Sequence, residues 1–81
     1  MVDDDELLES LAQATGLTRG ELDSTWSLLD LGLTSFRVMQ ALMRIEETFG
    51  IEFSDDEIVQ FPVVAARALP GLVRQRITTS G

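Results

Sequence analysis

The sequence predicts an all-α fold: a small four-helix bundle of three longer helices and one short helix, with a long loop between the first and second helices. Apolar residues recur at helical spacing in three segments, no segment shows the strict alternation of a strand, and capping residues or glycines mark most helix ends. With 81 residues, 44% of them hydrophobic, the chain is expected to form one domain over residues 1–81 around a single core.

The first helix is expected over Asp3 to Thr15. The acidic residues 3–6 suit the positive end of a helix dipole, and Gly16 can take the left-handed turn that commonly ends a helix. The apolar residues that recur at helical spacing in this segment are Leu7, Leu8, Leu11 and Ala14.

Residues 17–34 are expected to form a long loop, because they lack a sustained period and contain two glycines among several Ser, Thr and Asp residues. A loop of this length is usually functional or disordered, and its many apolar residues argue against disorder. Trp26 is interpreted as an anchor packed on the core rather than as a ligand platform. The side chains expected to point inward are Leu17, Leu22, Trp26, Leu28, Leu29 and Leu31.

The second helix, from Ser35 to Phe49, has the clearest pattern. An advance of about 100° per residue places its main apolar side chains in one narrow stripe, and Gly50 follows as the stop. The residues of this stripe are Val38, Leu42, Ile45 and Phe49.

A short third helix is expected over Asp55 to Gln60. Ser54 is suited to cap it, and Glu57, three residues later, completes a capping box. The acidic run at residues 55–57 lacks the alternating Asp and the glycine of a calcium-binding loop, so an acid-rich helix start explains it better and no metal site is predicted. The pair Phe61-Pro62 is expected to end the helix.

The last helix is expected to begin at about Val63. Pro70 would lie inside it, where proline costs about 3 kcal/mol and should kink or split the helix. Residues 78–81 are expected to form a frayed tail. The side chains expected to point inward are Val64, Ala68 and Leu72, with Val73 and Ile77 as further candidates.

The composition limits the chemistry available to the chain. It contains no cysteine and no histidine, which removes disulfides, thiolate nucleophiles, the usual general base and the commonest zinc ligand. Its formal charge of −8 disfavours nucleic acids and anionic membranes and favours partners with basic patches. No transmembrane segment and no signal peptide are expected, so a cytoplasmic protein is predicted.

The segment that leads into the second helix, LDLGLTSF at residues 29–36, resembles the attachment motif of acyl and peptidyl carrier proteins. The usual motif is Leu-Gly, an apolar residue, Asp-Ser, then Leu or Ile, with the serine at the start of the second helix. The resemblance continues through IEETFGI at 45–51, FSDDEI at 53–58 and FPVVAA at 61–66. One position departs from the motif, because Thr34 stands where the family usually has aspartate; a hydroxyl can still cap the helix, but the negative charge that could guide the transferase is absent.

The resemblance implies that Ser35 is modified with 4'-phosphopantetheine from coenzyme A by a phosphopantetheinyl transferase. The thiol of that arm would hold an acyl or aminoacyl group as a thioester, and the chain itself would be a monomeric, non-catalytic carrier. A helix start is a natural site for the phosphodiester, because free backbone N–H groups and the positive end of the dipole lie there. The alternative interpretation of Ser35 is an ordinary helix N-cap, a role that Thr34 could equally fill.

The resemblance also implies a docking surface on the second helix. Phe36, Met39 and Met43 lie off the core stripe, although Met39 could equally widen the core contact. Arg37, two residues from the serine, is expected to select a partner that presents a carboxylate or a neutral surface, whereas Arg44 is interpreted as ordinary solvated charge. The complete set of expected docking residues is Phe36, Arg37, Met39, Met43, Glu46 and Glu47.

The main functional hypothesis is a freestanding carrier for fatty-acid, polyketide or nonribosomal-peptide type biosynthesis. Its partners would be the transferase, an enzyme that loads the acyl or aminoacyl group, and a downstream synthase or transferase. The alternative is a helical adaptor of carrier-like fold that binds a partner without being modified. A catalytic role is the least favoured, because no histidine, cysteine or paired carboxylates are available to perform it.

Overall fold

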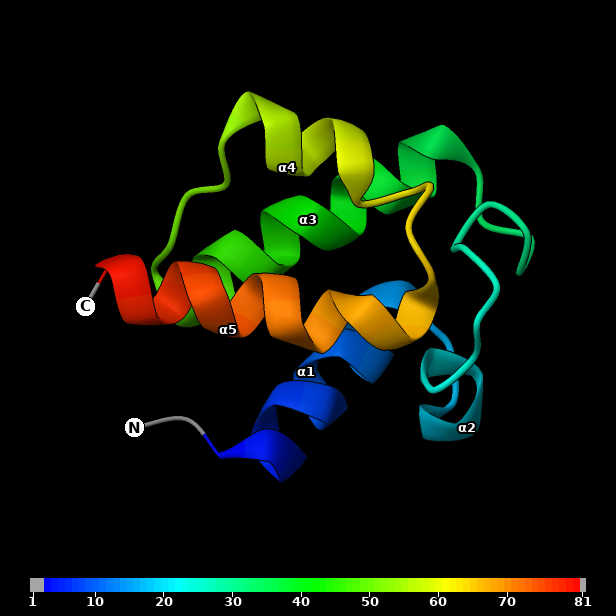
Figure 1. Cartoon of the computed structure of the whole chain (residues 1–81), viewed down its shortest axis with the longest axis horizontal. Coiled ribbons are helices and arrows are strands. Elements are labelled where there is room, and N and C mark those ends of the chain that lie inside the picture. The colour runs from blue at the N-terminus through cyan, green and yellow to red at the C-terminus, as the bar shows by residue number, and fades with distance from the viewer. Residues whose placement is uncertain (1–2, 81) are drawn as a thin grey trace.

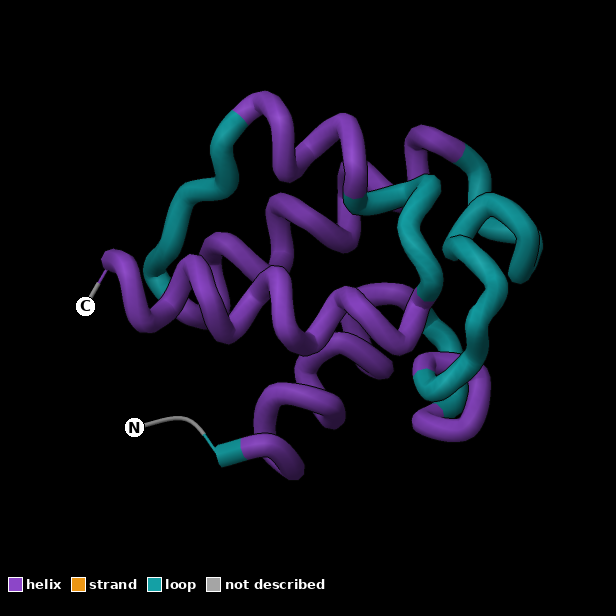
Figure 2. Tube along the Cα trace, in the orientation of Figure 1, coloured by secondary structure: helices purple, strands orange, loops and turns teal. Residues whose placement is uncertain are grey.

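A computed structural model describes the backbone of residues 3–80 and the side chains through Thr78. This part of the chain is helical and contains no strand, as predicted, and none of its helices is long and apolar enough to cross a membrane. Figures 1 and 2 show the helices packed together, joined by loops before α3, before α4 and between α4 and the last helical stretch. In chain order the helices are α1 (Asp4–Thr15), α2 (Arg19–Leu22), α3 (Ser35–Phe49), α4 (Asp55–Gln60), the 3-10 helix η1 (Ala66–Ala68) and α5 (Leu69–Ser80).

The core lies where α1, α3 and α5 face one another. Helix α1 packs against both α3 and α5, and Figure 1 shows α4 lying along the other side of α3. Phe61, which follows α4 and is fully buried, packs at a tilt against Phe53 with 5.8 Å between the ring centroids. The other large side chains that are almost completely buried are Leu7, Leu11, Leu22, Leu28, Val38, Leu42, Ile45, Leu69 and Val73.

Helices α1, α3 and α4 have the ends that the sequence predicts. The Asp3 side chain accepts from the Glu6 amide and caps α1, and Gly16 ends that helix in the left-handed conformation. Gly50 ends α3 in the same way. At α4, Ser54 and Glu57 form the predicted capping box. On α3, Val38, Leu42 and Ile45 are buried and Phe49 is half-buried, so the predicted core stripe is confirmed.

The expectation of one uninterrupted loop over residues 17–34 is wrong, because the short helix α2 lies within it. Thr18 and Glu21 form a capping box that closes this single turn, with Thr18 accepting from the Glu21 amide and Glu21 accepting from the Thr18 amide. Leu22 and Leu28 are buried as predicted, and Leu17 and Leu31 are partly buried.

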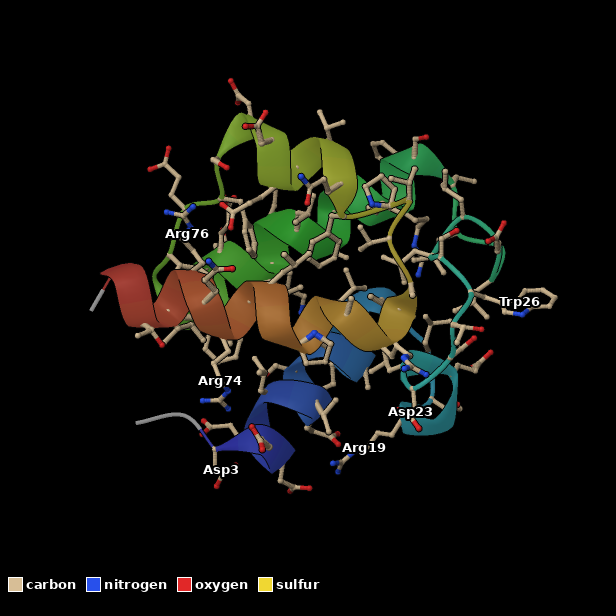
Figure 3. All side chains as sticks on the ribbon, viewed as in Figure 1. Asp3, Arg19, Asp23, Trp26, Arg74 and Arg76 are labelled. Carbon is tan, nitrogen blue, oxygen red and sulfur yellow. The ribbon has the colours of Figure 1, made fainter. Side chains whose placement is uncertain are left out.

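Trp26 and Leu29 are not core anchors, which contradicts their predicted roles. They are 59% and 40% exposed, and Figure 3 shows the Trp26 indole extending into solvent. The cause is a backbone contact across the fold. Ser27 pairs with Ala65 in an isolated antiparallel bridge, and the residue that is buried at this point is Ser27 rather than Trp26. The Trp26 carbonyl accepts from the Ala66 amide at 2.7 Å, which holds this segment against η1.

The last helix begins later than predicted. Residues 61–65 form turns rather than helix, and α5 begins at Leu69 after the turn of η1. Pro70 therefore lies in the first turn of α5, where its missing N–H costs no hydrogen bond, so the helix is split there rather than broken further on. Ala68 is exposed instead of inward, whereas Val73 is buried. Helix α5 continues through residues 78–80 of the expected tail, and residue 81 lies outside the described part.

Candidate functional site

Ser35 is the first residue of α3, and its side chain is exposed. The residue that caps the helix is Thr34, whose Oγ1 accepts from the Arg37 amide at 3.1 Å and whose carbonyl accepts from the Val38 amide at 3.0 Å. Within residues 3–80 the Ser35 hydroxyl makes no hydrogen bond. The interpretation of Ser35 as an ordinary N-cap is therefore wrong, and its oxygen is available to a reagent from solvent.

The loop that leads to Ser35 is tightly wound. Ser27 and Asp30 each accept a hydrogen bond from the other's backbone amide, at 3.1 and 3.3 Å. Three further backbone bonds close successive turns between residues 27 and 33. Gly32 has a φ of 102°, a left-handed value that only glycine takes without strain. This winding fixes the position from which α3 starts, and with it the position of Ser35.

The electrostatics at the start of α3 suit an anion. The amides of Ser35 and Phe36 come before the first intrahelical bond, and the first turn carries no acidic residue that would offset the positive end of the dipole. By contrast, the first turns of α1 and α4 carry three acids each. A phosphodiester on Ser35 Oγ would therefore be stabilised by the backbone of α3, and this position fits a phosphate-linked arm.

Exposed apolar side chains extend from this end of α3 along the helix. Phe36 is 71%, Met39 43% and Met43 60% exposed, so Met39 does not belong to the core. Val59 on α4 and Val63 on the turn after it are exposed as well, and no sequence pattern predicted their part in this surface. That turn lies beside the loop before Ser35, because the Pro62 carbonyl accepts from the Leu29 amide at 3.4 Å.

The three charged residues of the expected docking set differ in their surroundings. Arg37 is exposed, but its guanidinium reaches back towards α1: a Cβ placed on Gly16 would lie 3.4 Å from Arg37 Nη2. Glu46 is half-buried, and its Oε2 accepts from the Phe53 amide at 2.9 Å, which ties the link before α4 to α3. Glu47 is exposed. None of these residues approaches Ser35 through a hydrogen bond.

A shallow depression of about 580 Å³ lies at the other end of α3, between this helix and the start of α4. Its walls combine Met43 and Ile58 with the carboxylates of Glu46, Glu47, Glu52 and Asp55. Glu46 follows Ser35 by eleven positions of α3, which corresponds to about 17 Å along the helix axis. No group of carboxylates in residues 3–80 is arranged to hold a metal ion.

The family model for a phosphopantetheine attachment site matches residues 5–68, which extend from α1 to the end of η1. The chain belongs to the phosphopantetheine-binding carrier family. Comparisons with curated proteins and with solved structures find no match. Family membership means that this carrier domain is the site of covalent 4'-phosphopantetheine attachment. The exposed hydroxyl, the free amides and the acid-free first turn at the start of α3 fit that group.

Proposed function

We propose that Ser35 of this carrier bears the 4'-phosphopantetheine arm. The observation that carries the proposal is the division of roles between two adjacent residues, because Thr34 caps α3 and leaves the exposed Ser35 hydroxyl without a hydrogen-bond partner among the residues that the structure describes. In the modification, Ser35 Oγ would form the new bond to phosphorus, its proton would pass to the transferase, and the adenosine 3',5'-bisphosphate part of coenzyme A would leave. The bound arm supplies a thiol that carries acyl or aminoacyl groups as thioesters.

The fold supports a carrier in which this chain positions and presents the arm while other enzymes perform the chemistry. We propose that it serves fatty-acid, polyketide or nonribosomal-peptide type biosynthesis as a monomer in the cytoplasm. Its partners would be a phosphopantetheinyl transferase, a loading enzyme and a downstream synthase or transferase. The acidic composition favours partners that present basic surfaces.

The apolar ridge formed by Phe36, Met39 and Met43 is the surface that we propose these partners contact. Its three side chains are exposed on the helix that begins at Ser35, so an enzyme that reaches the arm can also cover them. Exposed apolar side chains of this size commonly mark protein–protein contacts. Glu46 and Glu47 follow the ridge at the end of α3 and would meet basic residues of the partner, and Arg37 at its start would meet a carboxylate or a neutral surface.

Mass spectrometry after incubation with coenzyme A and a broad-specificity transferase tests the assignment of Ser35. The wild-type chain should gain one phosphopantetheinyl group, and Ser35→Ala should gain none. Ser54→Ala is the matched control, because Ser54 is also an exposed serine at a helix start and lies outside the motif. Modification of the Ser35→Ala chain would refute the assignment, and a wild-type chain that is never modified would favour the adaptor hypothesis.

A further inference from the structure

The loop between α2 and α3 carries two apolar side chains that the core does not use. Trp26, the only tryptophan of the chain, is 59% exposed, and Leu29 is 40% exposed. Leaving an indole in water forgoes the stabilisation that burial of its large apolar surface would provide. We call these two side chains the Trp26 patch.

The backbone beneath the patch is fixed rather than loose. The Trp26 amide donates to Ser24 Oγ at 2.9 Å, and its carbonyl accepts from Ala66 at 2.7 Å. The Leu29 amide donates to the Pro62 carbonyl at 3.4 Å. An aromatic side chain presented on an ordered backbone loses little conformational freedom when a partner covers it. Exposed aromatic residues of this kind are enriched among the side chains that dominate binding energy.

The charged residues of the loop itself are all acidic. Residues 20–36 contain Glu21, Asp23 and Asp30, all exposed, and neither Lys nor Arg. One exposed cation, Arg67 of η1, adjoins this loop, because its amide donates to the Ser24 carbonyl at 3.0 Å. An apolar centre with an acidic border fits a protein surface that offers an apolar pocket edged by Lys and Arg.

The patch lies at the same end of the molecule as Ser35. Figure 1 shows the loop after α2 running along the end at which α3 begins, and Figure 3 shows Trp26 projecting outward there. Residues 27–33, whose turns are closed by backbone hydrogen bonds, connect Trp26 to the start of α3 and hold the two at a fixed separation. An enzyme that acts on Ser35 Oγ must approach this end.

We propose that the Trp26 patch is a docking contact for the phosphopantetheinyl transferase that modifies Ser35, with the indole entering an apolar pocket edged by basic residues of that enzyme. The proposal rests on the proposed function of Ser35. It adds a contact on the loop before α3 to the ridge on the helix itself. The negative segment 20–36 guides the approach, and the fixed indole supplies the apolar anchor.

The test measures initial rates of modification of the full chain by a transferase of the same organism, with coenzyme A and increasing carrier concentrations. Trp26→Ala should raise KM about tenfold or more with little change in kcat, because the indole binds but does not touch the reacting atoms. Trp26→Phe should recover part of the loss. Thr25→Ala, which removes an exposed neighbour, is the control and should stay within about twofold of the wild type.

The outcomes separate this proposal from the proposed function. If the wild-type chain and Trp26→Ala are modified with the same KM, the docking contact is refuted while the role of Ser35 stands. If neither is modified, both proposals fail. Sedimentation of the wild type and Trp26→Ala at the assay concentrations tests whether a second copy of the chain binds the patch instead. A wild-type dimer that Trp26→Ala dissociates would assign the patch to that second copy and overturn the proposal. Unchanged circular dichroism of Trp26→Ala would show that the exposed indole is not needed for folding.

Discussion

The guanidinium of Arg37 lies beside Gly16, at the carboxyl end of α1, although the two residues belong to different helices. The last turn of α1 contains no basic residue of its own. Arg37 therefore places a positive charge at the negative end of the α1 dipole. The sequence shows that Arg37 lies two residues after Ser35, but it does not show that the guanidinium lies at the end of α1.

Reversal of that charge should destabilise the fold. Arg37→Glu places a negative charge at the negative end of α1 and should lower the free energy of unfolding by about 0.3–1 kcal/mol at low salt. Arg44→Glu is the matched control, because Arg44 is an exposed arginine two turns further along the same helix. Urea unfolding of the two variants in low and high salt measures the difference. Equal losses of unfolding free energy in Arg37→Glu and Arg44→Glu would contradict the interaction of Arg37 with the end of α1.

Arg37→Glu also tests partner selection. If the cognate loading enzyme presents a carboxylate or neutral surface to Arg37, the variant should be loaded more slowly by that enzyme and faster by a generic fatty-acid enzyme with a basic surface. Loading rates with both enzymes at low ionic strength provide the measurement. Arg37→Gln separates the loss of a charge from its reversal. Unchanged rates would leave Arg37 with its structural contact alone.

Thr34 and Ser35 should have opposite sensitivities. Thr34→Ala removes the cap of α3 and should cost about 0.5–2 kcal/mol of stability while leaving the Ser35 hydroxyl in place. Ser35→Ala should cost less than about 0.5 kcal/mol, because its hydroxyl makes no hydrogen bond within the described chain, yet it should abolish modification. Chemical denaturation and mass spectrometry on both variants distinguish the roles. A larger stability loss for Ser35→Ala would contradict the assignment of the cap.

The ridge on α3 should matter to partners more than to folding. Phe36→Ala and Met43→Ala should each change the unfolding free energy by less than about 0.5 kcal/mol and weaken transfer to or from at least one partner enzyme. Leu42→Ala, from the buried face of the same helix, should instead cost about 2–5 kcal/mol. If the ridge variants lose as much stability as Leu42→Ala, the ridge is part of the core.

Glu57 should make the fold more stable at neutral than at acidic pH. Partial burial raises the pKa of this carboxyl, but the Ser54 amide and the Arg76 guanidinium outweigh it and hold the pKa below its ordinary value. Because the folded pKa is lowered, the stabilisation is present above the unfolded pKa of about 4.3 and is lost as pH falls through the folded value.

Denaturation of wild type and Glu57→Gln between pH 7 and pH 3 measures this contribution. The difference in unfolding free energy should be largest near neutrality and shrink below about pH 4. Asp56→Asn is the control, because Asp56 is an exposed carboxylate of the same helix turn. A difference that does not vary with pH would mean that Glu57 acts through packing or hydrogen bonds alone.

Most of the fold could be predicted because its signals are local. The limits of α3 follow from an apolar stripe, a cap and a terminal glycine, all within sixteen residues of Thr34. Helix α2 cannot be predicted from periodicity, because four residues do not show a period, although Thr18 and Glu21 carry the signature of a capping box. The exposure of Trp26 depends on the bridge between Ser27 and Ala65, which are far apart in sequence.

The same division applies to the site. The position of Ser35 at a helix start followed from the motif, and the exposure of Phe36 and Met43 followed from their angles around the helix. The position of the Arg37 guanidinium beside Gly16 and the hydrogen bond that Glu46 accepts from Phe53 could not be predicted, because each joins separate elements. Periodicity tells which way a side chain points but not what it meets.

The ion pair between Asp4 and Arg74, with 2.7 Å between Oδ1 and Nη2, joins residues 70 positions apart and has a consequence for the order of folding during synthesis. Val73, one residue before Arg74, completes the core cluster that contains Leu7 and Leu11. A nascent chain that has emerged only as far as η1 therefore leaves the apolar face of α1 without one of its partners. Helix α3 can cover part of the buried face of α1 earlier, but the part that meets α5 is covered only after α5 has left the ribosome.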